Sequence, residues 1–237
     1  MPEKIGITER GDAGIDLSWR DEMDNIAFTI VITKSVNDKF IEEVMKHAGK
    51  IIVHATVTGY GGTILEPNVR DYMWSYFQIL KLLEKGFNPN HIVLRMDPVI
   101  VTEKGIKVCE NVLKTFCCTG IKRVRYSYLD MYNHVKERFK KAGLPIPYDD
   151  LPDEKMIKKF MRILKKFNYE YESCAENNSH QLGCISQKDL DVLGLNIELM
   201  GSKNQRKGCL CPSNKYEMLK ERRQCPHKCL YCYWITK

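Results

Sequence analysis

Three cysteines near the end of the chain are the residues with the clearest capacity for chemistry. The segment 224–234 reads Q-C-P-H-K-C-L-Y-C-Y-W, so Cys225, Cys229 and Cys232 follow a C-x-x-x-C-x-x-C spacing. Three thiolates on a short loop can hold three corners of an iron–sulfur cubane and leave one iron open, and an open position distinguishes a catalytic metal site from a structural one. Soft thiolates suit zinc equally well, and His227 could serve as its fourth ligand, although it lies tightly between two of the cysteines.

Four further cysteines form a candidate second metal site. They lie after residue 173, and two of them make a C-x-C pair: Cys174, Cys184, Cys209 and Cys211. Four thiolates could hold an auxiliary iron–sulfur cluster or a structural zinc ion. The alternative interpretations are that these are ordinary buried cysteines or that they act as ligands in a different combination.

The composition indicates a cytoplasmic protein that does not enter a membrane. The chain has 237 residues, 43% of them apolar, and no uninterrupted apolar run of membrane-spanning length. The first ten residues are polar and lack the apolar core of a signal peptide, so we expect a reducing compartment, where clustered cysteines indicate metal binding or catalysis. The remaining three cysteines lie in a helical pattern and are expected to be buried: Cys109, Cys117 and Cys118.

The net charge of +7 is concentrated late in the chain. The basic residues of this part face only two glutamates, Glu217 and Glu221, and are the following: Lys203, Arg206, Lys207, Lys215, Lys220, Arg222, Arg223 and Lys228. They form either a solvated segment that keeps the protein soluble or a surface that faces a nucleic acid.

Apolar β-branched runs alternate with helical patterns along the chain. Six strands are predicted, at Ala27–Thr33, Ile51–Thr58, His91–Met96, Ile121–Tyr128, Tyr169–Cys174 and Leu195–Met200. Helices are predicted between or after them, at 37–47, 71–83, 103–116, 131–142, 154–167 and 186–193, with Asp153 and Ser186 as N-caps of the last two. This alternation predicts an α/β fold with a parallel sheet, either open and doubly wound or a partial barrel.

The cysteine motif resembles that of a known superfamily. C-x-x-x-C-x-Φ-C, with Tyr231 before the last cysteine, is similar to the cluster-binding motif of radical S-adenosylmethionine enzymes, where it normally lies near the N-terminus of a partial (β/α)6 barrel. Its C-terminal position resembles an uncharacterised branch whose members end in C-P-H-x-C-x-Y-C-Y, and there is a weaker local similarity to spore photoproduct lyase. The other matching blocks lie within residues 25–237: Thr56–Val69, Leu94–Ile100, Tyr126–Tyr132, Cys174–Glu176 and Gly208–Ser213. The N-terminal block departs from the branch, since Glu9–Asp16 reads E-R-G-D-A-G-I-D.

This resemblance implies a fold and an activity. Residues 1–200 would form a permuted partial (β/α)6 barrel, and residues 201–237 would be the cluster-binding segment of the same domain. Cys225, Cys229 and Cys232 would hold a 4Fe–4S cluster, whose open iron would bind S-adenosylmethionine, with Tyr231 near the adenine. One electron, from a donor such as a flavodoxin or a ferredoxin, would yield a 5′-deoxyadenosyl radical that abstracts hydrogen from an unknown substrate, which could be a nucleic acid. The alternative is a non-catalytic, metal-stapled nucleic-acid-binding protein.

Several unusual residues follow the predicted strands and should meet at the carboxyl-terminal ends of these strands. Gly59, Gly61 and Gly62 could let the backbone approach a cofactor, or they could form a tight turn. Arg95 and Asp97 are two residues apart on a strand and so share a face. They could form an ion pair or bind the carboxylate of the methionine. Weaker polar candidates at such positions include Glu66 and Ser127, and His54 is expected to be a satisfied core histidine.

Overall fold

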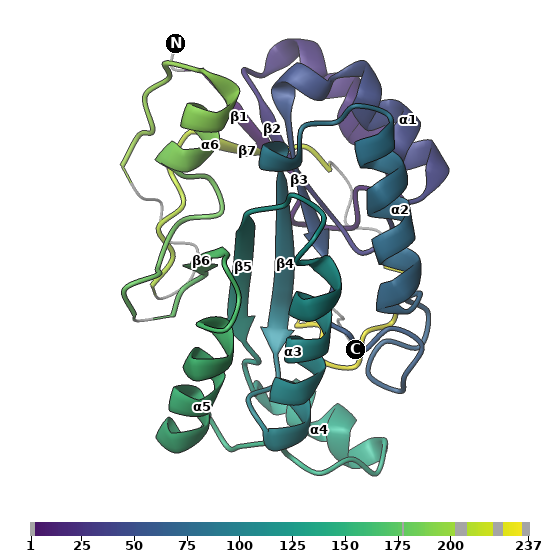
Figure 1. Cartoon of the computed structure of the whole chain (residues 1–237), viewed down its shortest axis with the longest axis vertical. Helices are drawn as coiled ribbons and strands as arrows, with labels where there is room; N and C mark the ends of the chain where they lie inside the picture. Colours follow the sequence, from purple (N-terminus) through teal and green to yellow (C-terminus); the bar gives the residue numbers. More distant parts are fainter. Residues whose placement is uncertain (1–2, 177, 202–207, 220–224, 234–237) are drawn as a thin grey trace.

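The computed structural model describes residues 3–176, 178–201, 208–219 and 225–233. In this part of the chain, seven parallel strands form one sheet in the order β6-β5-β4-β3-β2-β1-β7 (Figure 1). The strands are β1 (Ile5–Ile7), β2 (Thr29–Thr33), β3 (Ile51–Thr56), β4 (Ile92–Val99), β5 (Arg123–Tyr128), β6 (Glu170–Ser173) and β7 (Lys215–Glu217). The predicted α/β class and the parallel sheet are therefore confirmed.

Most α-helices begin where the sequence supplies a capping side chain, whereas the helix that follows Tyr132 has no side-chain cap. Asn37 accepts a hydrogen bond from the amide of Phe40, and Asp153 accepts from the amides of Lys155 and Met156. Such caps satisfy amides that have no partner within the helix. The helices are α1 (Asp38–Lys46), α2 (Tyr72–Glu84), α3 (Glu103–Phe116), α4 (Asn133–Lys141), α5 (Glu154–Leu164) and α6 (Gln187–Leu193), with short 3-10 helices at Leu17–Asn25, Ala48–Lys50 and Pro89–His91.

The two faces of the sheet have different coverings. Helices α1, α2, α3 and α5 pack on one face, where they enclose the largest apolar cluster (Figure 1). On the other face, α6 and the segment 195–199 cover an apolar cluster that also contains Cys174, Cys184, Cys209 and Cys211. A third cluster joins α4 and the loops after β3, β4 and β5 to Cys229 and Tyr231. The first two clusters bury opposite faces of the same alternating strands.

The prediction of a strand at Leu195–Met200 was wrong. Leu195, Ile197 and Leu199 are half-buried and alternate with exposed residues, which gives the period of a strand, but the segment joins no ladder of the sheet. The edge on the β1 side of the sheet is formed instead by β7, which the sequence did not reveal. Strands β1 and β7 each have three residues, too few to display a period.

Among the described residues, no helix combines the length and the apolar character that crossing a membrane would require.

Candidate metal centre

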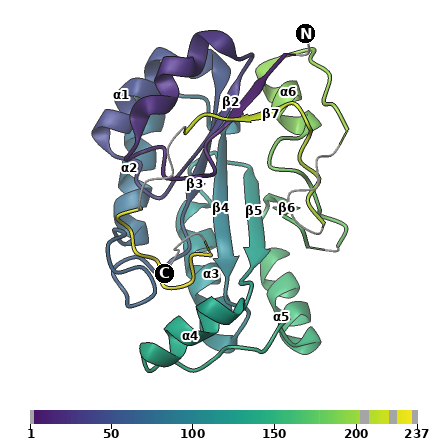
Figure 2. The ribbon, with the colours of Figure 1, turned by 180° about the vertical axis from the view of Figure 1, so that it is seen from behind.

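The C-terminal segment 225–233 lies against α4 and against the loops that follow β3, β4 and β5 (Figure 2). The amide of Leu230 donates to the carbonyl of Leu65 at 2.9 Å. The guanidinium of Arg138, on α4, donates to the carbonyl of Cys232 at 2.7 Å. These contacts hold the cysteine motif beside the carboxyl-terminal ends of the strands. Parallel α/β folds place their active sites at these strand ends.

The three cysteines of the motif are partly or fully shielded from solvent. Cys229 is buried, whereas Cys225 and Cys232 are half-buried, and the amide of Cys232 donates to the carbonyl of Cys229 at 3.1 Å. Burial raises the pKa of Cys225 to about 11 and that of Cys229 to about 12. A nucleophilic cysteine needs a lowered pKa, so these two thiols are poorly suited to direct attack. They are suited to ligation, because a bound metal displaces the thiol proton.

A buried network of charge lies directly behind these cysteines. The ammonium of Lys34 lies 2.7 Å from Glu66 Oε1 and 3.2 Å from the hydroxyl of Tyr231, which itself donates to Glu66. Thr58 Oγ1 also donates to Glu66 Oε1, at 2.7 Å. Burial opposes ionisation of Glu66, but the charge of Lys34 and the hydrogen bonds from Lys34, Tyr231 and Thr58 lower the pKa of Glu66 overall.

Lys34 connects this network to the sulfur atoms. Burial opposes its charge, but the neighbouring Glu66 and the charge that Cys229 can carry raise the pKa of Lys34 overall. A cation held beside three thiolates stabilises their ionised, metal-binding form. The network therefore places a buried ion pair beside Cys229, in which Glu66 balances the charge of Lys34.

His227 is held by hydrogen bonds through both ring nitrogens. Its Nε2 lies 2.7 Å from Asp12 Oδ2, and its Nδ1 lies 3.4 Å from the carbonyl oxygen of Asn68. Burial lowers the pKa of His227, but the hydrogen bond and the charge of Asp12 raise it overall. A ring engaged at both nitrogens is poorly placed to ligate zinc, so this geometry speaks against His227 as a fourth ligand.

Asp12 and Lys34 were not selected from the sequence. Asp12 accepts hydrogen bonds from four donors, namely the amides of Gly14 and Lys34, the hydroxyl of Thr33 and the ring of His227. Lys34 directly follows β2, so the reasoning that singled out the ends of the later strands would also have found it. Asp12 lies in the loop after β1, a strand too short to be recognised, and within the divergent block Glu9–Asp16.

Arg95 and Asp97 lie close together on β4, as their spacing predicts. The guanidinium of Arg95 donates to Asp97, which also accepts from the hydroxyl of Ser127. Burial opposes the charge of Arg95, but Asp97 raises its pKa overall. The Nε of Arg95 is buried without a hydrogen-bond partner in the described part of the chain, so this atom can still receive an acceptor.

Two of the three glycines after β3 are required by packing. Gly59 has φ +84°, and a Cβ there would lie 2.4 Å from Val108 Cγ1. A Cβ on Gly61 would lie 2.0 Å from the carbonyl oxygen of Arg70. Gly62 has φ +75° and faces open space. Close packing therefore accounts for glycine at positions 59 and 61, and of the three only Gly62 has open space where a side chain would begin.

The structure also brings together members of the second cysteine group. Cys174 Sγ and Cys184 Sγ lie 3.9 Å apart, and the amide of Cys184 donates to Cys211 Sγ at 3.2 Å. Cys209 belongs to the same buried cluster. Ligand atoms of Glu9, Cys184 and Cys211 lie within 4.8 Å of one another, so these residues form a group able to bind a metal ion.

Three sequence expectations need correction. Cys109 is buried as predicted, but Cys117 and Cys118 are exposed, because they lie at and beyond the end of α3. His54 is fully buried, but neither ring nitrogen has a hydrogen-bond partner among the described residues, so it is not a satisfied core histidine. Burial lowers the pKa of His54 well below its usual value, and the neighbouring arginines lower it further.

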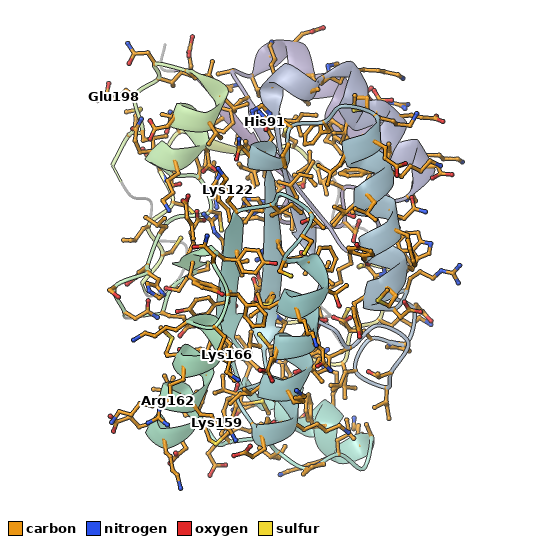
Figure 3. The ribbon with its side chains drawn as sticks, in the orientation of Figure 1. His91, Lys122, Lys159, Arg162, Lys166 and Glu198 are labelled. Carbon is orange, nitrogen blue, oxygen red and sulfur yellow. The ribbon has the colours of Figure 1, made fainter. Side chains whose placement is uncertain are left out.

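Most of the late basic residues lie outside the described part of the chain: Lys203, Arg206, Lys207, Lys220, Arg222 and Arg223. Lys215 is half-buried, and its ammonium lies 2.8 Å from the carboxylate of Glu9. Figure 3 labels other basic side chains on α5 and just after it. Two of these have acidic partners on α3, since Lys159 pairs with Glu103 and Lys166, two residues beyond the end of α5, pairs with Glu110. These ion pairs join α5 to α3.

Comparison with known proteins gives one match. Residues 17–234 match the family described as Domain of unknown function (DUF1848). No curated protein and no solved structure matches the chain. The matched range includes all strands except β1 and all cysteines of the two groups, and the chain therefore belongs to the DUF1848 family.

Proposed function

We propose that this protein is a radical S-adenosylmethionine enzyme whose 4Fe–4S cluster is held by Cys225, Cys229 and Cys232. The observation that carries the proposal is the position of these cysteines at the carboxyl-terminal edge of a parallel sheet, beside the buried Lys34–Glu66–Tyr231 network. A purely structural staple would not need a buried cation and a buried carboxylate beside it. Such groups are costly to bury unless they serve a site.

The donor set fits a cluster better than a single ion. A tetrahedral metal with bonds of about 2.3 Å to sulfur holds its sulfur ligands about 3.8 Å apart. Within the described residues, the only set of three ligand atoms closer together than 4.8 Å is that of Glu9, Cys184 and Cys211, so the three sulfurs of the C-terminal motif are more widely spaced. A cubane, which binds each thiolate to a different iron, suits this wider spacing.

The chain's own residues would position the reactants. When bound, the cluster and S-adenosylmethionine supply one-electron chemistry that gives a radical able to abstract hydrogen. Lys34, paired with Glu66, interacts electrostatically with Cys229, and Tyr231 presents its ring beside Lys34 while its hydroxyl is fixed by Glu66. Arg95, whose Nε has no hydrogen-bond partner among the described residues, can bind a carboxylate, and Gly62 leaves space for the adenosyl group.

The partial barrel belongs to the same proposal. The sheet has two edges, β6 and β7, and all seven strands in the described part run parallel. In Figure 2 the segment before β7 runs alongside the loop that follows β6. Gln181, in that loop, donates to the carbonyl of Gly208 at 2.6 Å. The edges thus approach each other through their flanking loops, as in a barrel that lacks some of its strands.

Product analysis tests the proposal. The protein is reconstituted anaerobically with iron and sulfide and then given S-adenosylmethionine and dithionite. We expect a brown protein with absorbance at about 400 nm and formation of 5′-deoxyadenosine. The variants Cys225→Ala, Cys229→Ala and Cys232→Ala should lose both properties, whereas Cys118→Ala, which alters an exposed cysteine, should keep them. A protein that binds no iron, or that binds iron at the motif without forming 5′-deoxyadenosine, would contradict the proposed activity.

A further inference from the structure

We propose that Glu9, Cys184 and Cys211 bind one zinc ion through three protein ligands, with a fourth coordination position left for water. This inference goes beyond the proposed activity and does not rest on it. Ligand atoms of the three residues lie within 4.8 Å of one another, and no other three His, Cys, Asp or Glu side chains of the described residues come so close. A tetrahedral zinc holds its sulfur and oxygen ligands about 3.5–3.8 Å apart, so small side-chain movements suffice to close the site.

Three segments that are distant in the sequence bring these ligands together. Glu9 follows β1, Cys184 lies between β6 and α6, and Cys211 precedes β7, which pairs with β1. The approach of the last two segments depends on Gly183, because a Cβ there would lie 2.7 Å from a backbone carbonyl oxygen of the segment before β7. The amide of Glu9 donates to the carboxylate of Glu217, on β7, at 2.9 Å. Since no ladder joins the two edges of the described sheet, the metal would connect the loop after β6 to the edge formed by β7.

The two cysteines are oriented for ligation. Cys184 is 4% exposed and Cys211 is 1% exposed, and the amide of Cys184 donates to Cys211 Sγ at 3.2 Å. A hydrogen bond of this kind orients a thiolate ligand and stabilises its charge. The side chain of Glu9 is 23% exposed, so it offers a side from which a metal ion can enter the otherwise buried site.

The charge of the site stays balanced when zinc binds. The ammonium of Lys215 lies 2.8 Å from Glu9 Oε2 and interacts electrostatically with Cys211. A carboxylate has two oxygens, so Glu9 can accept from Lys215 and bind a metal ion at the same time. Zinc displaces the protons of the two thiols, so its two positive charges replace the two that leave. The ion therefore enters without adding net charge to a buried site, which lowers the cost of its burial.

The neighbouring cysteines Cys174 and Cys209 lie outside the ligand set. Cys174 Sγ is 3.9 Å from Cys184 Sγ, but neither Cys174 nor Cys209 joins a set of three ligand atoms within 4.8 Å of one another. With three protein ligands, zinc keeps one position for an exchangeable ligand, as catalytic rather than structural zinc sites do. Two thiolates beside one carboxylate favour zinc over Mg²⁺ and Ca²⁺, which prefer oxygen ligands.

Metal analysis of a variant without the C-terminal motif provides the test. The full-length triple variant Cys225→Ala, Cys229→Ala, Cys232→Ala should bind one zinc per chain. Further change of Cys184→Ser or Cys211→Ser should abolish this binding, and Glu9→Gln should weaken it at least about 10-fold, since loss of a ligand costs no less than loss of its supporting contacts. The matched controls Cys174→Ser and Cys209→Ser should keep the zinc. Loss of zinc in either control, undiminished affinity in Glu9→Gln, the absence of zinc, or iron and sulfide in its place would overturn the proposal.

Glu9→Gln changes a partly exposed side chain, so it decides the case in which a further cysteine variant fails to fold. Should the triple variant itself fail to fold, Cys184→Ser in the unaltered chain should lower the zinc content by one per chain, and an unchanged content would overturn the proposal. Cobalt in place of zinc reports the ligands directly, because a tetrahedral ion with two thiolates gives visible bands and sulfur-to-metal charge transfer. Added imidazole should shift these bands by entering the fourth position. Bands of four thiolates, or bands that imidazole leaves unchanged, would contradict the site, whereas none of these results bears on radical formation at the C-terminal motif.

Discussion

Replacement of Asp12 should destabilise the protein strongly, because this one carboxylate satisfies four donors. Oδ1 accepts from the amide of Gly14 at 2.9 Å and from the hydroxyl of Thr33, and Oδ2 accepts from the amide of Lys34 and from the ring of His227, each at 2.7 Å. A buried donor without a partner costs about 1–3 kcal/mol, and breaking a buried ionic pair costs about 3–5 kcal/mol. These terms overlap, so we expect Asp12→Ala to lower the free energy of unfolding by about 3–5 kcal/mol.

The smaller change Asp12→Asn distinguishes the two oxygens. Its amide oxygen can keep the bonds of Gly14 and Thr33, but its NH₂ group would face the amide of Lys34, another donor. We therefore expect Asp12→Asn to cost about 1–3 kcal/mol. Urea denaturation, followed by circular dichroism under anaerobic conditions, gives both values, with the exposed Asp149→Asn as the control. A cost below about 1 kcal/mol for Asp12→Ala would refute the reasoning.

The contribution of the Asp12–His227 ion pair to the free energy of unfolding depends on pH. The pKa of Asp12 is lowered from 3.8, so its contribution is present above that value and is lost as the pH falls. The pKa of His227 is raised from 6.5, so its contribution is complete below that value and is lost as the pH rises through the folded pKa. The free-energy cost of Asp12→Asn should thus be largest between these two values and decline as the pH rises through the raised pKa of His227. A cost that grows steadily with pH would contradict the ion pair.

Two further predictions concern the sheet and the loop after β3, and urea denaturation measures both. Arg125→Met leaves the buried Glu172 with one cation fewer and should cost about 3–5 kcal/mol; a cost near zero would show that Arg125 does not stabilise the carboxylate. Gly59→Ala combines a positive φ with an overlap between the new Cβ and Val108, so it should lower the free energy of unfolding by about 2–4 kcal/mol. Gly62→Ala meets only the positive φ and should lower it by about 1–2 kcal/mol. Equal costs would exclude the packing explanation for Gly59.

The sequence was informative wherever a pattern was long enough to repeat. Five strands and six helices were located within a few residues, because they combine periodic apolar positions with caps such as Asp153. Strands β1 and β7 escaped prediction because each has three residues, and Leu195–Met200 imitated a strand by alternating half-buried and exposed side chains. Pairing in the sheet depends on contacts between distant segments, which local periodicity does not contain.

The candidate site was predictable only in part, for a similar reason. Cysteine spacing identified the motif, and a position after a strand identified Glu66 as a weaker candidate. The partners that hold the site come from elsewhere in the chain, since Asp12 meets His227 across more than two hundred residues. A buried aspartate in an unrecognised loop carries no local signal, so only the folded chain reveals it.

Electron paramagnetic resonance tests most directly whether the cluster at Cys225, Cys229 and Cys232 keeps an iron open to a small molecule. The reconstituted protein is reduced with dithionite, and its spectrum is recorded with and without S-adenosylmethionine. The account predicts a cluster signal that changes shape when S-adenosylmethionine is added and that is absent from Cys229→Ala. A signal indifferent to S-adenosylmethionine, or no iron signal at all, would contradict it.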